Sequence, residues 1–282
     1  MTIIKTVFVS LISMLFLSFQ TAYINKPVVY LFNDFDKEFE IESQAIYGEK
    51  VVILEKDKDY YFVESEDKTV RAYVHKDHLI ETDYRNSPNI RPTKSLMTHL
   101  YKTDDTSPFP PILTVPFGTL LKLEKLEEEP KRWIGVELVD GTKAYVQKGD
   151  IDFYPRKLSI DEMIALSKKF MGLPYVWGGD SSFGYDCSGF VKMLYAKMGV
   201  QLPRNSGQQA KSDLLYSVEK KDLVVGDLLF FGNTRVTHIG IYVGDNKFIH
   251  STVNDLGPKV TISDLNTTQA NYLFSKRLKP SL

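Results

Sequence analysis

The feature that most constrains the fold of this chain is the stretch Tyr175–Gly199, YVWGGDSSFGYDCSGFVKMLYAKMG. Its first half is rich in glycine and aromatic residues, which is typical of a tight loop. From Phe190 to Met198 the apolar residues recur with helical spacing, and Gly199 is a natural helix end. The loop therefore leads into a helix, and Cys187, the only cysteine in the 282 residues, lies where the helix begins.

This position of Cys187 favours a nucleophile. A thiol at a helix N-terminus lies near the positive end of the helix dipole and near unpaired backbone N–H groups, which favour the thiolate and lower the pKa. The same N–H groups can hold an oxyanion that forms on attack of a carbonyl. The alternative is a structural thiol, because free cysteine is among the most buried residue types.

A base for this thiol is expected on a hairpin further along the chain. LVVGDLLFFG predicts an apolar strand, with Asp227 serving the turn that opens it, and THIGIYVGDNKFIHST predicts a hairpin turning at Gly244–Asp245–Asn246. His238 and His250 are evenly spaced about Gly244, so we expect them to be cross-strand neighbours on one face. One imidazole would face Cys187 and the other would orient it. The alternative for each is a strand histidine without function.

Two related β-rich segments precede this part of the chain, at residues 26–84 and 90–155. IYGEKVVILEK in the first corresponds to VPFGTLLKLEK in the second, and the tripeptide AYV recurs after 72 residues. Two copies predict a tandem duplication of a small barrel rather than a solenoid. From residue 158 the pattern changes to a helix, SIDEMIALSKKFMG, with Ser159 and Glu162 placed as in a capping box.

Residues 1–22 have the pattern of a secretory signal. Lys5 precedes an uncharged, mostly apolar run at 6–19, which is shorter than the roughly 20 residues of a membrane span. Gln20 stands where a small residue is preferred if cleavage follows Ala22. We expect export to the cell envelope or the medium, without stable membrane association after signal removal. A retained membrane anchor is the alternative, and no lipid anchor is expected because no cysteine follows the run.

Composition excludes some classes of partner. The net charge of −1 at pH 7 gives no field that would draw the protein to nucleic acid or to anionic lipid. His75, His78 and His99 lack the close, ordered spacing of zinc ligands, so we expect no metal and no cofactor.

The motifs of residues 158–282 occur together and in a fixed order: YVWGG, YDCSGFV, LPRNS, GDLLFF, THIGIYVG and FIHS. This set resembles the NlpC-type cell-wall cysteine peptidases, a papain-like family of bacterial murein hydrolases. The two leading segments resemble bacterial SH3-like domains. The resemblance implies an α+β fold class, in which a papain-like domain with helices packed on a central antiparallel sheet follows two SH3-like barrels.

The resemblance also implies roles for particular residues. Cys187 is the implied nucleophile, His238 the general base and His250 the group that orients it, while Tyr175 is implied to help at the oxyanion. The implied substrate-lining residues are Asp186, Ser188, Arg204, Ser206 and Trp177. For Trp177 the favoured interpretation is that it supports the loop rather than contacting the substrate.

The implied reaction is hydrolysis of the γ-D-glutamyl–diamino acid bond in freed stem peptides, L-Ala-γ-D-Glu-diamino acid, with lysine or diaminopimelate as the diamino acid. An acidic residue of the first barrel is implied to pair with the L-Ala amine. Sequence does not choose between Glu38, Glu40, Glu42 and Glu49, and for each the alternative is a solvated charged face. The alternatives for the whole protein are a non-catalytic cell-wall binding protein, an endopeptidase acting on intact murein, or an enzyme that uses the same site for acyl transfer or amide cleavage on another substrate.

Overall fold

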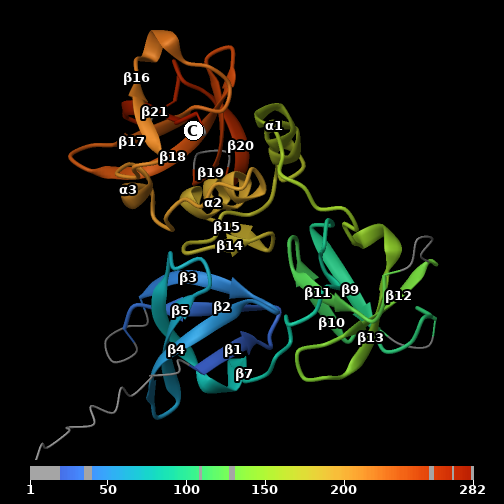
Figure 1. The fold of residues 1–282 in the computed structure, drawn as a ribbon. Coiled ribbons are helices and arrows are strands. Elements are labelled where there is room, and N and C mark those ends of the chain that lie inside the picture. Colours follow the sequence, from blue (N-terminus) through green and yellow to red (C-terminus); the bar gives the residue numbers. More distant parts are fainter. Residues whose placement is uncertain are drawn as a thin grey trace, which may run out of the picture.

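The computed structural model describes residues 20–34, 40–107, 110–126, 131–253, 257–268 and 270–280. Figure 1 shows three units in these residues: two β modules, in blue and green, and a C-terminal unit in yellow to red that carries the α-helices. The predicted signal falls largely on residues 1–19, which lie outside the described residues. No helix within the described ranges is long and apolar enough to span a bilayer.

The first β module is an antiparallel sheet in the order β3-β2-β6-β5-β4-β1-β7. Its strands are β1 (Gln20–Ile24), β2 (Val28–Phe32), β3 (Ile41–Ile46), β4 (Lys50–Asp57), β5 (Tyr60–Ser65), β6 (Arg71–His75) and β7 (Leu79–Ile80). The module starts before residue 26, because Ala22 and Ile24 of β1 are fully buried in its core. Cleavage after Ala22 would therefore remove three of the five residues of this core strand.

The second β module repeats this arrangement, with the order β10-β9-β13-β12-β11-β8. Its strands are β8 (Ile90–Pro92), β9 (Met97–Tyr101), β10 (Leu113–Pro116), β11 (Leu120–Leu123), β12 (Trp133–Glu137) and β13 (Lys143–Gln147). The AYV tripeptides lie on β6 and β13, and in both the alanine and the valine are fully buried. The sequence repeat thus reflects equivalent core positions, since alternate residues of a strand face the same side.

Two tyrosines join the β modules. The hydroxyl of Tyr47 accepts a hydrogen bond from the backbone N–H of Val139 (2.7 Å), and that of Tyr84 accepts one from the N–H of Lys122 (3.1 Å). Both rings are buried in a core that the second module contributes to. The modules are therefore packed on one another.

The C-terminal unit is built on an antiparallel sheet in the order β16-β21-β17-β18-β19-β20. The strands of this sheet are β16 (Leu215–Val218), β17 (Leu228–Gly232), β18 (Val236–Gly244), β19 (Lys247–Thr252), β20 (Lys259–Asp264) and β21 (Tyr272–Leu278). The unit also has a separate two-stranded sheet of β14 (Asp180–Ser181) and β15 (Gly184–Tyr185). Its α-helices are α1 (Ile160–Lys168), α2 (Cys187–Lys197) and α3 (Ser206–Gln209). The predicted capping box of Ser159 and Glu162 is present at the start of α1.

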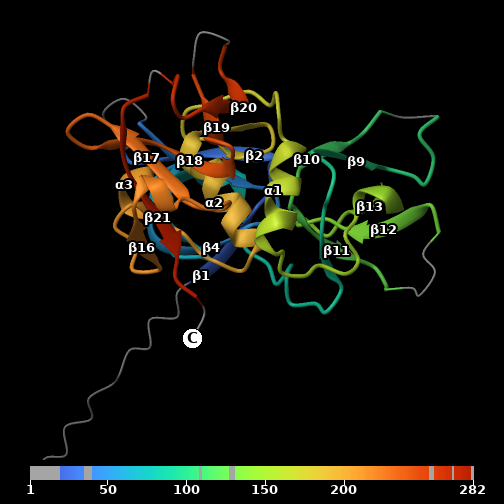
Figure 2. The ribbon, with the colours of Figure 1, turned by 90° about the horizontal axis from the view of Figure 1, so that it is seen from above.

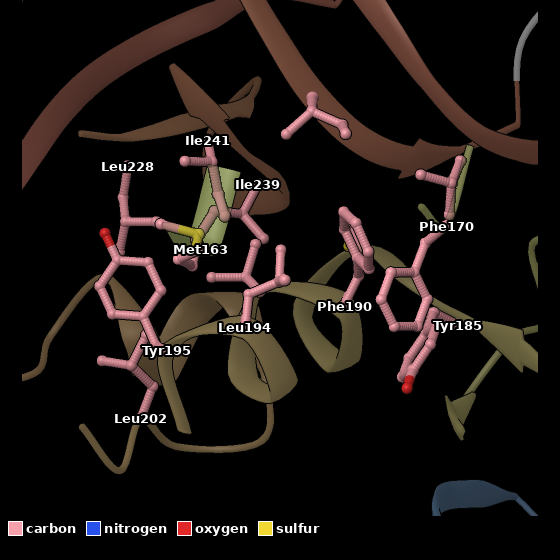
Figure 3. Packing of buried hydrophobic residues seen from close by; sticks show 14 of the residues in the cluster. Met163, Phe170, Tyr185, Phe190, Leu194, Tyr195, Leu202, Leu228, Ile239 and Ile241 are labelled. Carbon is pink, nitrogen blue, oxygen red and sulfur yellow. The ribbon is translucent and has the colours of Figure 1, made fainter. Parts of the chain in front are cut away.

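The core of this unit holds α2 against the sheet. Figure 3 shows Phe190 and Leu194 of α2 on the side that faces Ile239 and Ile241 of β18. All four side chains are fully buried, and each stabilises the fold by about 1.5–3 kcal/mol through removal of apolar surface from water. This packing sets where the first residue of α2 lies relative to β18.

Helix α1 lies at the edge of the C-terminal unit nearest the second module, as the view from above shows (Figure 2). The rings of Phe170, just after α1, and Phe117 of the second module meet edge to face, with centroids 5.2 Å apart. The expected α+β class is met only in part, because the described chain is mostly β. Both modules consist of strands, and in the described ranges the C-terminal unit adds two helices of more than one or two turns.

Candidate active site

Cys187 is the first residue of α2, as predicted. The side chain of Asp186 caps the helix, its Oδ1 accepting a hydrogen bond from the N–H of Gly189 (2.7 Å). A Cβ on Gly189 would lie 2.2 Å from the carbonyl oxygen of Gly179, so only glycine lets the helix approach the loop this closely. The glycine-rich loop and the helix start therefore form one rigid piece around the thiol.

The pKa of Cys187 differs from the sequence expectation. The thiol is only 7% exposed, and burial, with the carboxylate of Asp186 as the next cause, raises its pKa to about 12. The backbone N–H groups of Ile239 and Ser188 and the charge of Arg204 act in the opposite direction and are outweighed. Desolvation of the charged form thus exceeds the effect of the helix terminus, and the resting thiol is neutral.

The two predicted histidines meet on neighbouring strands. His238 lies on β18 and His250 on β19, and Nε2 of His238 is 2.7 Å from Nδ1 of His250. The hairpin turns at Asp245 and Asn246, whose φ values of 50° and 55° are typical of the tight turns that join twisted strands.

Their pairing is diagonal, not direct as predicted. Ile241 pairs with Ile249, so the residue opposite His250 is Gly240, and His238 lies two positions further along β18. A Cβ on Gly240 would be 3.2 Å from the Cβ of His250. Glycine therefore leaves the space across which the His250 ring reaches its diagonal neighbour.

Ser263 on β20 extends the pair to a third strand. Its Oγ lies 2.9 Å from Nε2 of His250. Sequence analysis did not single out this serine, because its place beside His250 depends on the register between β19 and β20. The only local signal was a small hydroxyl residue that follows the β-branched residues of KVTI.

The contacts between His238, His250 and Ser263 fit two arrangements of protons, with the donors running in opposite directions. Burial lowers the pKa of His238 to about 4; burial, and next the neighbouring His238, lowers that of His250 to about 2, so both rings are neutral at pH 7. If His250 donates from Nε2 to Ser263, its Nδ1 accepts from Nε2–H of His238. In that arrangement Nδ1 of His238 carries a lone pair that can accept a proton.

Three predicted residues stay accessible near this site. Tyr175 is partly buried, and its backbone forms an isolated β-bridge with Tyr185. Burial, followed by the charges of Cys187 and Asp186, raises the pKa of the Tyr175 hydroxyl, so this group stays protonated and can donate a hydrogen bond. Trp177 is 68% exposed, and Ser206 is the partly exposed first residue of α3, which packs against β18.

Arg204 does not have the substrate-lining position that the resemblance implied. It is fully buried, and its guanidinium donates to both carboxylate oxygens of Asp186 (3.0 and 2.6 Å), to Ser188 Oγ (3.0 Å) and to the carbonyl of Gly179 (3.2 Å). Nε donates to Ser43 Oγ of the first module (2.9 Å). Every donor position thus has a protein acceptor, so Arg204 positions the site and does not line the substrate. Asp186 and Ser188 are buried with it.

Strand β3 of the first module seats against the loop that precedes Cys187. Figure 1 shows β14 and β15 between α2 and β3. Oε1 of Gln44 accepts from Ser181 Oγ (2.9 Å) and from the N–H of Asp180 (3.2 Å). A Cβ on Gly178, at φ +71°, would be 2.3 Å from Cγ2 of Ile41. The module is therefore part of the wall around the loop.

Among the candidate acidic residues, Glu42 reaches the C-terminal unit. Its Oε1 accepts a hydrogen bond from Nδ2 of Asn205 (2.7 Å), the residue that precedes α3. Glu40 is exposed, Glu49 lines a separate cavity, and Glu38 lies outside the described residues.

Comparison with known proteins assigns the family. Residues 172–277 match the model of the NlpC/P60 family. The chain is similar to the gamma-D-glutamyl-L-lysine dipeptidyl-peptidase of Bacillus cereus, with 31% identity over 75% of this chain and 67% of that protein. It is also similar to the protein so named from Bacillus subtilis, with 30% identity over 84% of this chain and 79% of that one.

A solved structure agrees along almost the whole chain. The crystal structure of an NlpC/P60 family protein from Bacillus cereus covers 92% of this chain and all of its own, with a TM-score of 0.79 and 26% identity. The chain belongs to the NlpC/P60 family. It is a cysteine peptidase, and so a hydrolase, as the motif resemblance predicted.

The histidine pair predicts a dependence of stability on pH. The folded pKa values, about 4 and about 2, lie below the ordinary 6.5, so below pH 6.5 the unfolded chain binds more protons. The free energy of unfolding should fall from pH 6.5 to 4, each histidine adding a slope of up to about 1.4 kcal/mol per pH unit. Urea unfolding at several pH values measures this slope.

The matched variants are His238→Asn with His250→Asn, which should flatten the slope, and His99→Asn, an exposed histidine of the second module, which should leave it unchanged. Equal slopes in the double variant and the parent would contradict the assignment of both rings as buried and neutral.

Proposed function

We propose that this protein is an exported cysteine peptidase that hydrolyses the γ-D-glutamyl–diamino acid bond of short peptidoglycan stem peptides carrying a free N-terminal L-Ala. The observation that carries the proposal is the helix-start thiol of Cys187 in the same unit as the linked rings of His238 and His250. The names of the two Bacillus relatives support the γ-D-glutamyl bond as the target.

In the proposed first step, Nδ1 of His238 accepts the Sγ proton while the sulfur attacks the γ-carbonyl carbon. Because the pKa of the thiol lies above that of the imidazole, the proton moves as the C–S bond forms and not before. The backbone N–H of Cys187 and the hydroxyl of Tyr175 hold the oxyanion. The Nε2–H contact to His250 keeps the His238 ring in the accepting tautomer.

In the second step the imidazolium of His238 donates its proton to the nitrogen of the leaving diamino acid, and the C–N bond breaks. The γ-glutamyl group stays on Cys187 as a thioester. Water then attacks the thioester carbonyl while His238 takes the water proton. The C–S bond breaks, His238 returns the proton to the sulfur of Cys187, and L-Ala-D-Glu is released as the acid product.

The preference for short peptides is proposed from the packing of β3 against the loop that precedes Cys187. The contacts of Gln44 and Ile41 bring the first module against the loop, and Glu42 lies at Asn205, next to Ser206. We assign Glu42 the pairing with the L-Ala ammonium, with Ser206 at the same end of the site. The β modules are proposed to be SH3-like barrels, supported by their short antiparallel strands in curled sheets.

Cys187→Ala should abolish cleavage of L-Ala-γ-D-Glu-L-Lys and of its diaminopimelate counterpart, because no other described side chain supplies a thiol. Chromatography with mass detection measures the released diamino acid, and circular dichroism checks the fold. Full turnover by the folded variant would refute the mechanism. Binding of this variant to purified walls without any turnover by the parent would instead favour a wall-binding protein.

Glu42→Gln should raise KM for the free-amine tripeptide by about tenfold, the effect of losing one ion pair worth about 1.4 kcal/mol, with little change in kcat. The N-acetylated tripeptide, which lacks the ammonium, should be cleaved equally slowly by parent and variant. Glu40→Gln, at an exposed site on the same module, is the matched control. If the parent cleaves the N-acetylated peptide or intact murein as fast as the free tripeptide, the preference for freed peptides is wrong.

Ser263→Ala should lower kcat by about fivefold, since a hydrogen bond of about 1 kcal/mol no longer orients His250. Ser263→Thr keeps the hydroxyl and should restore the rate, while Ser217→Ala, an exposed serine on β16, should be neutral. An unchanged kcat in Ser263→Ala would limit the catalytic chain to the two histidines.

A further inference from the structure

The two β modules and helix α2 enclose a cavity of about 480 Å³. The described residues that line it come from the β3–β4 turn of the first module, from the start of the second module and from the later turns of α2, and do not include Cys187, His238 or His250. This volume is in the range of small-molecule sites, which often lie between domains. The cavity is therefore separate from the peptide-cleaving site.

The α2 wall of the cavity carries two ammonium groups in different situations. Lys192 is paired, at 2.9 Å from Asp180 and 3.2 Å from Asp67. Lys197 forms no ion pair with any described residue, and its Nζ lies 4.7 Å from the centre of the Phe117 ring. Burial lowers the pKa of Lys197, and the charge of Asp152 acts in the opposite direction. Its charge is only partly compensated by the ring.

The first module contributes a carboxylate to the cavity, that of Glu49. Oε2 of Glu49 accepts one hydrogen bond, from the N–H of Ile46 (3.0 Å), and the side chain stays accessible to solvent inside the cavity. Lys192 acts on Glu49 but is already paired with Asp180 and Asp67, and no described residue forms an ion pair with the Glu49 carboxylate.

We propose that this cavity binds a small zwitterion, an amino acid or a dipeptide, whose carboxylate pairs with Lys197 and whose ammonium pairs with Glu49. Phe117, Met193 and the ring of Tyr185 give its side chain an apolar surface. A ligand with a single charge satisfies only one of the two groups and binds less well. Since α2 begins at Cys187, the bound molecule contacts the helix that carries the thiol.

The test is calorimetric titration of the full chain carrying Cys187→Ala, with L-alanine, L-lysine and L-alanyl-L-glutamate as probes and with acetate and methylammonium as single-charge controls. We expect at least one zwitterion to bind with a Kd of about a millimolar or below, and the controls to bind at least about tenfold more weakly. Lys197→Met and Glu49→Gln should each weaken the zwitterion at least about tenfold. Lys94→Met, a lysine at a different hollow of the second module, should not.

The proposal is overturned if no zwitterion binds up to about ten millimolar. It is also overturned if binding survives both substitutions, or if Glu42→Gln removes binding while Lys197→Met keeps it, which would place the ligand at the peptide-cleaving site. Lys197→Gln is the second variant if Lys197→Met fails to fold, and a co-crystal with the bound probe locates it directly. Because the probes are not turned over, failure here leaves the proposed hydrolysis untouched.

Discussion

The buried ion pair of Asp186 and Arg204 is the interaction on which the rest of the site depends. Two charges taken out of water are costly unless hydrogen bonds satisfy them, and removal of one partner from such a pair destabilises a protein by about 3–5 kcal/mol. Here Ser188, the carbonyl of Gly179 and Ser43 of the first module complete the set of partners. The pair therefore holds the start of α2, the loop before it and the neighbouring module in one arrangement.

Burial also sets the protonation of Cys187 and His238, the proposed nucleophile and base. The same desolvation that raises the pKa of Cys187 lowers that of His238, so both are neutral in the free protein. A neutral imidazole can accept a proton, and a neutral thiol does not react with passing electrophiles as readily as a thiolate. In the proposed mechanism the thiolate therefore forms only during attack on a bound carbonyl, and the linked His250 and Ser263 hold the His238 ring in place for it.

The local features of this site could be predicted from the residues alone. The loop-to-helix change at Cys187, the capping box of Ser159 and the turn near Asp245 depend on residues a few positions apart, whose conformations are governed by capping and turn chemistry. The diagonal offset of His238 from His250 was not predicted, because a shift of the turn centre by one residue changes every cross-strand partner.

The amino-acid sequence alone predicts Cys187 as the nucleophile and His238 and His250 as its partners, and it shows the repeated β pattern, since these follow from residue type and short-range periodicity. Long-range packing sets the remainder. It buries Arg204 instead of exposing it to substrate, brings Ser263 to His250, and seats Glu42 of the first module at the C-terminal unit. These contacts join residues up to 163 positions apart, and they form only when strand register and the desolvation of charged groups are settled together.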